Sequence, residues 1–157
     1  MFGISLISKL LERRSLRSTI KISILGLINN LHREDIRKFR FVNFVGEEKD
    51  RLIYASWLGK ITFPVYFYFD DSDCLEQVLF IMEHKSKLGI SDYDKNQETF
   101  ALLVNKIISP LINKPPTRSN NSGSEWKVNN VDIQLLFNGV DVRLILEKND
   151  DNNTNAG

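Results

Sequence analysis

Apolar residues recur at helical spacing through the first forty positions of the chain. The apolar positions between residues 4 and 11 predict a helix from Ile4 to Arg14. Those between residues 20 and 31 predict a second, longer helix capped by Ser18. Residues 19–25 also alternate like a strand, but the apolar positions continue over about three helical turns, which favours the helix. A short helical stretch around Glu34 to Lys38 follows.

From Phe39 onwards the pattern changes to aromatic and β-branched residues. Three runs predict strands at residues 39–45, 52–57 and 61–69, and the short links between them predict an antiparallel meander. Pro64 lies in the third run and has no backbone N–H, so we expect it at a sheet edge or a bulge.

Two further helices are predicted after the meander. The turn Asp70–Asp73 supplies capping carboxylates ahead of an apolar run from Leu75 to Met82, which predicts a helix ending near Gly89. Residues 91–97 are polar and predict a connection. The apolar positions between residues 100 and 108 predict the second helix, which ends near Pro110.

The last part of the chain predicts a β-hairpin. Residues 131–137 and 140–146 both alternate, and Asn138-Gly139 between them is the preferred pair for a two-residue turn. Residues 126–128 belong to the same strand or extend it through a bulge. The preceding residues 112–124 are turn formers and predict a long loop.

This order of elements predicts an α+β fold: N-terminal helices, a three-stranded antiparallel meander, two helices and a C-terminal β-hairpin. No internal repeat is visible, and 157 residues are typical of one domain. We therefore expect a single domain over residues 1–147 and a disordered polar tail over residues 148–157.

Composition is that of an ordinary globular chain, with 42% hydrophobic and 26% charged residues. The single cysteine, Cys74, cannot form an internal disulfide, which favours a reducing compartment. Lys9 interrupts the first apolar run, and no apolar stretch reaches about 18 residues, so neither a signal peptide nor a transmembrane segment is predicted. We expect a cytoplasmic location.

No residue set predicts catalysis. Cys74 and His84 would lie about 15 Å apart on one helix, too far for a thiol–imidazole pair. His32 stands near Glu34 and Asp35, but that segment is equally typical of a helix start. The chain also lacks zinc-ligand spacings and glycine-rich phosphate loops. We therefore expect no enzyme, no metal, no cofactor and no small-molecule substrate.

Charge is segregated along the chain. Residues 1–40 carry nine Lys and Arg against three Asp and Glu, whereas residues 66–100 carry eight acids against three bases. The basic residues include a set at four-residue spacing with one neighbour: Lys9, Arg13, Arg17 and Lys21, with Arg14. On one helix they would share a face that suits an adaptor for nucleic acid or anionic membrane. Because no nucleic-acid motif accompanies them, a solvated helix face is the simpler interpretation.

Two segments suggest a family. They are Ser56-Trp57-Leu58-Gly59-Lys60, which leads into Phe63-Pro64-Val65-Tyr66-Phe67, and Glu125-Trp126-Lys127-Val128 with Val131-Asp132-Ile133. Together with the length, the high Asn and Lys content and the absence of catalytic motifs, the chain resembles the small immunity proteins of bacterial polymorphic toxin systems. These include the systems of contact-dependent growth inhibition.

The resemblance implies a protein that binds one cognate toxin domain and neutralises it by covering its active site. Many such toxins are nucleases with basic clefts, so an acidic patch would imitate phosphate and steer association. The residues expected to bind the toxin are Asp70, Asp71, Asp73, Glu76, Asp92, Tyr93 and Asp94.

Overall fold

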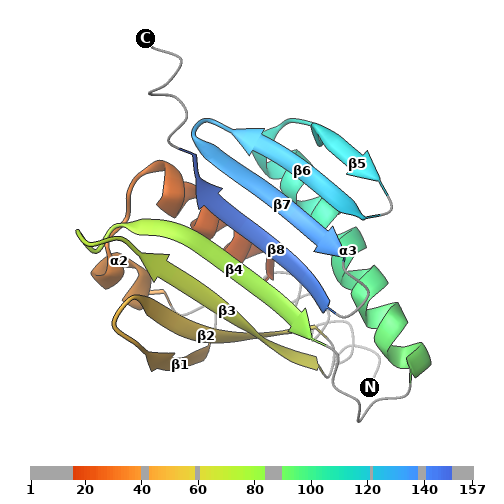
Figure 1. Ribbon diagram of the computed structural model, residues 1–157, viewed down its shortest axis with the longest axis horizontal. Coiled ribbons are helices and arrows are strands. Elements are labelled where there is room, and N and C mark those ends of the chain that lie inside the picture. Colours follow the sequence, from red (N-terminus) through yellow and green to blue (C-terminus); the bar gives the residue numbers. More distant parts are fainter. Residues whose placement is uncertain are drawn as a thin grey trace, which may run out of the picture.

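The computed structural model describes residues 16–39, 43–58, 61–83, 90–120, 122–137 and 141–149, with the backbone alone for 57–58, 61, 83, 90–99 and 103. This part of the chain forms an eight-stranded sheet in which every neighbouring pair is antiparallel (Figure 1). The strands are β1 Asn43–Glu47, β2 Arg51–Leu58, β3 Ile61–Phe69, β4 Leu75–Glu83, β5 Arg118–Asn120, β6 Gly123–Val128, β7 Val131–Phe137 and β8 Asp141–Lys148. Residues 16–28 are helical, and two further helices are α2 Arg33–Arg37 and α3 Ile90–Ile112.

The topology repeats a helix followed by a four-stranded meander. Strands β1 to β4 follow the helix at 16–28 and α2, and strands β5 to β8 follow α3. The order across the sheet is β1-β2-β3-β4-β8-β7-β6-β5, so the two meanders meet where β4 pairs with β8. The sequence shows no repeat, yet each half contributes four strands to a shared sheet; two helices precede the first four strands and α3 precedes the second four.

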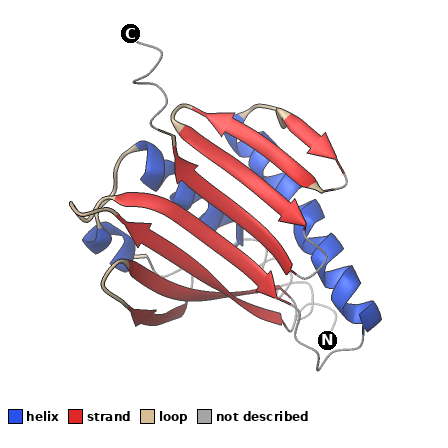
Figure 2. Cartoon of the chain, viewed as in Figure 1, coloured by secondary structure: helices blue, strands red, loops and turns tan. Residues whose placement is uncertain are grey.

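The helix at 16–28 and α3 lie on the same face of the sheet (Figure 2). Register partners on that face are buried across five adjacent strands: Tyr54, Val65, Phe80, Leu144 and Leu135. The helices add a second layer of buried side chains: Leu16, Ile20, Ile24 and Leu27, with Phe100, Val104 and Ile108 from α3. The rings of Phe63 and Phe100 meet edge to face with centroids 5.4 Å apart, a favourable aromatic geometry.

The predicted α+β layout is wrong because the chain forms one large sheet instead of a three-stranded meander and a separate hairpin. The main error is β4, which was expected to be a helix. Val78, Phe80 and Met82 alternate toward the core, while β3 and β8 pair with β4 on either side. Leu79 and Ile81 alternate with them on the opposite face, where they are half-buried, so residues 78–82 form an unbroken apolar run that also matches a helical pattern.

The acids before β4 do not cap a helix. The carboxylate Oδ1 of Asp70 accepts hydrogen bonds from the N–H groups of Ser72 and Cys74, each 2.9 Å long, and so closes a tight turn. Asp73 adopts a positive φ of 59°, which an aspartate tolerates better than most residues. The same short polar side chains that favour helix caps here form the turn between β3 and β4.

The C-terminal layout also differs from the prediction. Helix α3 begins at Ile90, within the segment expected to be a connection, and continues past Pro110 to Ile112. The expected loop at 112–124 contains β5 and the start of β6, and the hairpin is extended to a meander of four strands. Residues 126–128 belong to β6, a strand of its own, and Asn129 at φ 51° supports the turn into β7.

Several local predictions are confirmed. The helix predicted from residue 20, the short helix near Glu34 and the three strands of the meander are all present, with β1 described from Asn43. The predicted cap of the first of these helices is wrong, because residues 16–19 are already helical and Ser18 lies inside the helix. Pro64 lies in an interior strand, but β3 pairs with β4 only from Val65 onwards, so its missing N–H leaves no ladder bond unmade there. The predicted helix at Ile4 to Arg14, the Asn138-Gly139 turn and residues 150–157 of the expected tail lie outside the described residues.

Candidate functional site

The face of the sheet opposite the helices is covered by no element of the described chain (Figure 1). Side chains alternate between the two faces of a strand, so the register identifies the residues of this open face. One row of half-buried partners runs across it: Ile53, Tyr66, Leu79, Ile145, Gln134 and Glu125. We call its first four members the apolar stripe. This stripe crosses β2, β3, β4 and β8, so both halves of the fold contribute to it.

Arg51 stacks against two tyrosines beside the apolar stripe. Its guanidinium carbon lies 4.7 Å from the ring centroid of Tyr66 and 5.9 Å from that of Tyr68. Its Nη1 donates to the Tyr68 hydroxyl at 3.2 Å, and Nε and Nη2 donate to the Glu48 carboxylate at 2.9 and 3.1 Å. The bonds to Glu48 and then to Tyr68 raise the pKa of Arg51, and the bond from Arg51 lowers the pKa of Glu48. The cluster is therefore a fixed, charged and aromatic element of the open face.

A second row of register partners on the open face contains two adjacent acids, with Lys127 of β6 next in the row. Gln77 of β4 opposes Glu147 of β8, and Glu147 opposes Asp132 of β7. In the pairing of β3 with β4, Tyr68 opposes Gln77 and Phe69 opposes Leu75. Glu76 is therefore the extra residue of a bulge in β4. We call Glu76, Glu147 and Asp132 the acidic row. Among the described residues no ion pair involves any of the three, and Asp132 accepts a hydrogen bond from the Asn149 side chain at 2.8 Å.

Directly opposed like charges destabilise a sheet, so the pairing of Glu147 with Asp132 costs stability. Elsewhere on the open face the strand charges are compensated: Arg143 pairs with Asp141 at 3.1 Å, and Arg51 pairs with Glu48. Asp132 is opposed on its other side by the exposed Lys127 of β6, so Glu147 and Glu76 are the members of the acidic row without a directly opposed cation. A basic partner would compensate these two carboxylates.

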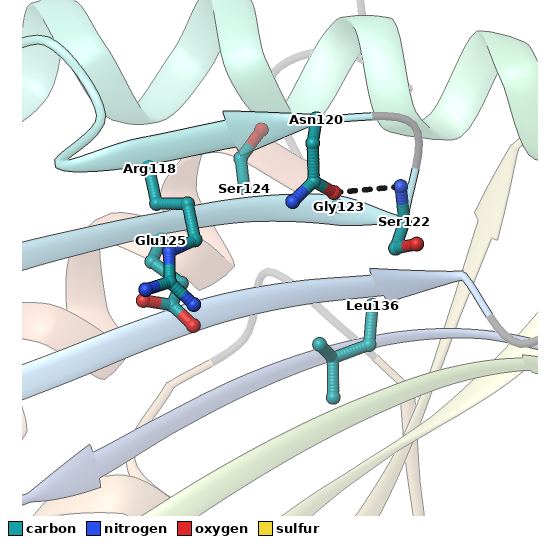
Figure 3. Close-up of a pocket in the computed structure, with 7 residues that line it drawn as sticks. All are labelled: Arg118, Asn120, Ser122, Gly123, Ser124, Glu125 and Leu136. Atoms are coloured by element: carbon teal, nitrogen blue, oxygen red, sulfur yellow. Dashed lines mark hydrogen bonds between the residues drawn. The ribbon is translucent and has the colours of Figure 1, made fainter.

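The far edge of the sheet has a shallow hollow formed by β5, β6 and β7 (Figure 3). Arg118 and Glu125, which are register partners, line one part of it, and Leu136 lines another. Its volume is about 180 Å³, below the roughly 300–1,000 Å³ of pockets that enclose small ligands. We assign no ligand to it.

The structure separates the residues that sequence analysis grouped as a toxin-binding patch. Asp70 closes its own turn, and Asp73 pairs with Arg33 at 3.3 Å, so both carboxylates have structural partners. Asp71 and Glu76 are exposed and have no ion pair among the described residues. The backbone of residues 92–94, which contains Asp92, Tyr93 and Asp94, lies in the first turns of α3, and their side chains lie outside the description.

These two acidic segments lie toward opposite ends of β4. Asp70 to Asp73 precede the strand, whereas α3 begins beyond its end (Figure 1). Glu147 and Asp132 were missed because each follows an apolar residue in an alternating strand, and only the register brings them opposite each other and brings Glu147 opposite Gln77, the neighbour of Glu76 in the chain. A sequence signal existed for Asp132, which occupies an outward position of the predicted strand at 131–137, whereas Glu147 lies one residue beyond the strand predicted at 140–146.

Arg33 holds the turns at this end of the molecule together. Its guanidinium donates to the carbonyl groups of Glu48 and Lys49 at 3.1 and 2.6 Å and pairs with Glu47 at 3.1 Å. It also lies 5.0 Å from the centroid of the Phe69 ring. Arg33 of α2 thereby connects the β1–β2 turn to the β3–β4 turn. These contacts hold in place the turns that lie next to Arg51 and that contain Asp71.

The basic helix face is described only in part. Arg17 and Lys21 are exposed on the helix at 16–28, whereas Lys9, Arg13 and Arg14 lie outside the described residues. None of the helices in the described part of the chain has the length and apolarity that a bilayer-spanning helix needs.

No family model, curated protein or solved structure matches the chain. The open face with its apolar stripe, the Arg51 cluster and the acidic row is therefore interpreted from its own residues.

Proposed function

We propose that the protein acts by binding another protein through the open face of its sheet, as an immunity-type inhibitor that covers the active site of a cognate toxin domain. The observation that carries the proposal is the combination, on one uncovered face, of half-buried apolar residues, an arginine stacked on two tyrosines and an acidic row. No catalytic role is assigned to any residue.

The apolar stripe and the Arg51 cluster have the composition of a protein interface. Tyrosine and arginine are enriched among the residues that contribute most of the binding energy of protein interfaces. They make this contribution when neighbouring groups exclude water from them. Arg51 is held in place by Glu48 and Tyr68 before any partner binds, so little side-chain entropy remains to be lost on association. The stripe beside it offers the apolar centre around which such anchors are found.

The acidic row defines the chemistry of the partner. Glu147 and Asp132 repel each other in the free protein, and a partner with lysine or arginine side chains at its rim would replace this repulsion by attraction. A nuclease toxin with a basic, phosphate-binding cleft has this chemistry. Exposed Asp71 and Glu76 extend the acidic surface toward the β3–β4 turn.

The test uses the toxin domain encoded by a reading frame beside the gene. We expect the wild-type chain to protect cells that express this domain and to bind it in solution. Tyr66→Ala and Arg51→Ala should each weaken binding at least tenfold, as truncation of interface anchors does, and should reduce protection. The matched control is Leu102→Ala, which removes an exposed apolar side chain from α3 and should leave the affinity unchanged.

Far-ultraviolet circular dichroism establishes that each variant is folded. Affinity lost in Leu102→Ala but retained in Tyr66→Ala and Arg51→Ala would place the interface on the helical side and refute the open face. If no neighbouring domain binds the wild-type chain, the immunity function is refuted.

A further inference from the structure

Cys74 and His32 lie directly opposite each other in an isolated antiparallel bridge that joins the start of α2 to the start of β4. The N–H of Leu75 donates to the Leu31 carbonyl at 2.8 Å, and the N–H of Arg33 donates to the Asp73 carbonyl at 3.0 Å. Both bonds flank the bridge, so His32 and Cys74 form a non-hydrogen-bonded pair. In such pairs the opposing side chains approach most closely. The backbone therefore sets the contact between thiol and imidazole.

The thiol of Cys74 faces the His32 imidazole and the Ser72 carbonyl. Cys74 Sγ lies 4.0 Å from His32 Nε2, within the range of a hydrogen bond to sulfur. Asp70 fixes the cysteine backbone on both sides, because its carboxylate accepts the Cys74 N–H and its own N–H donates to the Cys74 carbonyl, each at 2.9 Å. Cys74 is half-buried and His32 is exposed, so a small reagent can reach the pair.

We infer that Cys74 is a reactive thiol, with His32 as its base, that forms mixed disulfides with low-molecular-weight disulfides such as oxidised glutathione. His32 Nε2 takes the proton from Sγ, and the thiolate attacks one sulfur of the reagent. A new S–S bond forms to Cys74 while the S–S bond of the reagent breaks. The departing thiolate takes the proton from the imidazolium. The thiol of Cys74 is oxidised, and half of the reagent is reduced to a free thiol.

This inference does not depend on the proposed binding function. Sequence analysis excluded a partner for Cys74 because it considered only His84 on a shared helix. The pairing with His32 arises from the strand at 75–83 and the tight turn before it, across 42 positions of the chain.

The experiment measures the rate at which the full chain reacts with a chromogenic aromatic disulfide (DTNB). Cys74 is the single cysteine, so the whole signal reports on it. We expect His32→Gln to slow the reaction at pH 7 at least about tenfold, because the variant lacks the base that takes the thiol proton. The difference in rate between the wild type and His32→Gln should shrink as the pH is raised, because hydroxide then removes the thiol proton without His32. His84→Gln, which removes the other histidine, should react like the wild type.

A second readout uses oxidised glutathione and mass spectrometry, with the adduct expected quickly in the wild type, slowly in His32→Gln and not at all in Cys74→Ser. Equal rates and equal pH profiles in the wild type and His32→Gln would overturn the inference. A thiol that reacts only in urea would overturn it as well. If His32→Gln loses the circular dichroism spectrum of the wild type, the wild-type rate at pH 7 decides: a rate no higher than that of a short cysteine peptide refutes the role of His32 as base.

Discussion

The indole Nε1 of Trp126 in β6 donates a hydrogen bond to the hydroxyl of Ser109 in α3, with the two atoms 3.1 Å apart. Trp126 is only 1% exposed, so water cannot replace this acceptor. The bond ties the helix of the second half of the fold to its own meander, seventeen positions further along the chain. It also explains how a tryptophan with a polar N–H can be fully buried.

Ser109→Ala should therefore destabilise the protein although it improves helix propensity. Leaving the buried indole N–H without an acceptor costs about 1–3 kcal/mol, whereas alanine gains about 0.5 kcal/mol in a helix. We expect a net loss of about 1–2 kcal/mol in the free energy of unfolding, measured by urea denaturation. Ser122→Ala is the control, since that exposed residue bonds through its backbone N–H, and it should remain within about 0.5 kcal/mol of the wild type. Equal stability of the two variants would contradict this role of Ser109.

Sequence analysis succeeded where a pattern had one period. The helix near residue 20, the strands β2 and β3, and the alternation in β7 and β8 all followed from local spacing. It failed at β4, where Leu75, Val78, Leu79 and Met82 fit a helical face and a central strand equally well. Only pairing with β3 and β8 distinguishes the two, and that pairing joins residues up to about seventy positions apart. Once β4 is a strand, the two halves merge into one sheet.

Gly123 begins β6 in a conformation that other residues rarely adopt. Its φ is +147°, and a Cβ built at this position would lie 1.8 Å from the carbonyl oxygen of Leu135 in β7. Gly123→Ala must therefore push β6 away from β7, and we expect a loss of at least about 2–3 kcal/mol in unfolding free energy. Gly46→Ala in β1 is the matched control, because a Cβ there meets no atom within 4 Å. Both free energies are measured by urea denaturation, and a Gly123→Ala variant as stable as Gly46→Ala would refute the constraint.

The carboxylate of Glu47 gives the protein a specific sensitivity to acid. Hydrogen bonds from Arg37 and then from Arg33 lower the pKa of Glu47 below its usual value. A carboxylate with a depressed pKa in the folded state stabilises the fold above its unfolded pKa of about 4.3, and this contribution is lost as the pH falls through the folded value. We expect the unfolding free energy to fall from about pH 5 downwards, and to fall less steeply in Glu47→Gln.

The measurement is urea denaturation at a series of pH values between 7 and 3. Asp71→Asn is the control, because Asp71 is exposed, lies outside the acidic row and makes no ion pair with a described residue, and it should keep the slope of the wild type. Parallel curves for the wild type and Glu47→Gln would show that the bonds from Arg37 and Arg33 do not stabilise the fold.

Prediction of the candidate site from sequence was limited by the same long-range pairing. The acidic charge of the middle of the chain was visible, but Asp70 and Asp73 are occupied by a turn and by Arg33. Glu147 and Asp132 lie in a segment whose net charge is unremarkable, and they become neighbours only through the register of β7 and β8. Composition can therefore indicate that acids are abundant, whereas their surface grouping depends on strand order.

Neutralising Glu147 in the acidic row should have opposite effects on the stability of the protein and on its binding to a basic partner. Removing one of two opposed carboxylates relieves their repulsion, so Glu147→Gln should raise the unfolding free energy by a few tenths of a kcal/mol, about 0.2–1. Glu125→Gln is the matched control on the same face, because Glu125 opposes Arg118 and its neutralisation relieves no repulsion. For a basic partner the effect is reversed: Glu147→Gln should slow association, and the loss should shrink as salt is added. Urea denaturation and association kinetics at several salt concentrations check the two effects. A Glu147→Gln variant that is less stable than the wild type would show that the opposed pair is not repulsive, and the charge argument for a basic partner would fail with it.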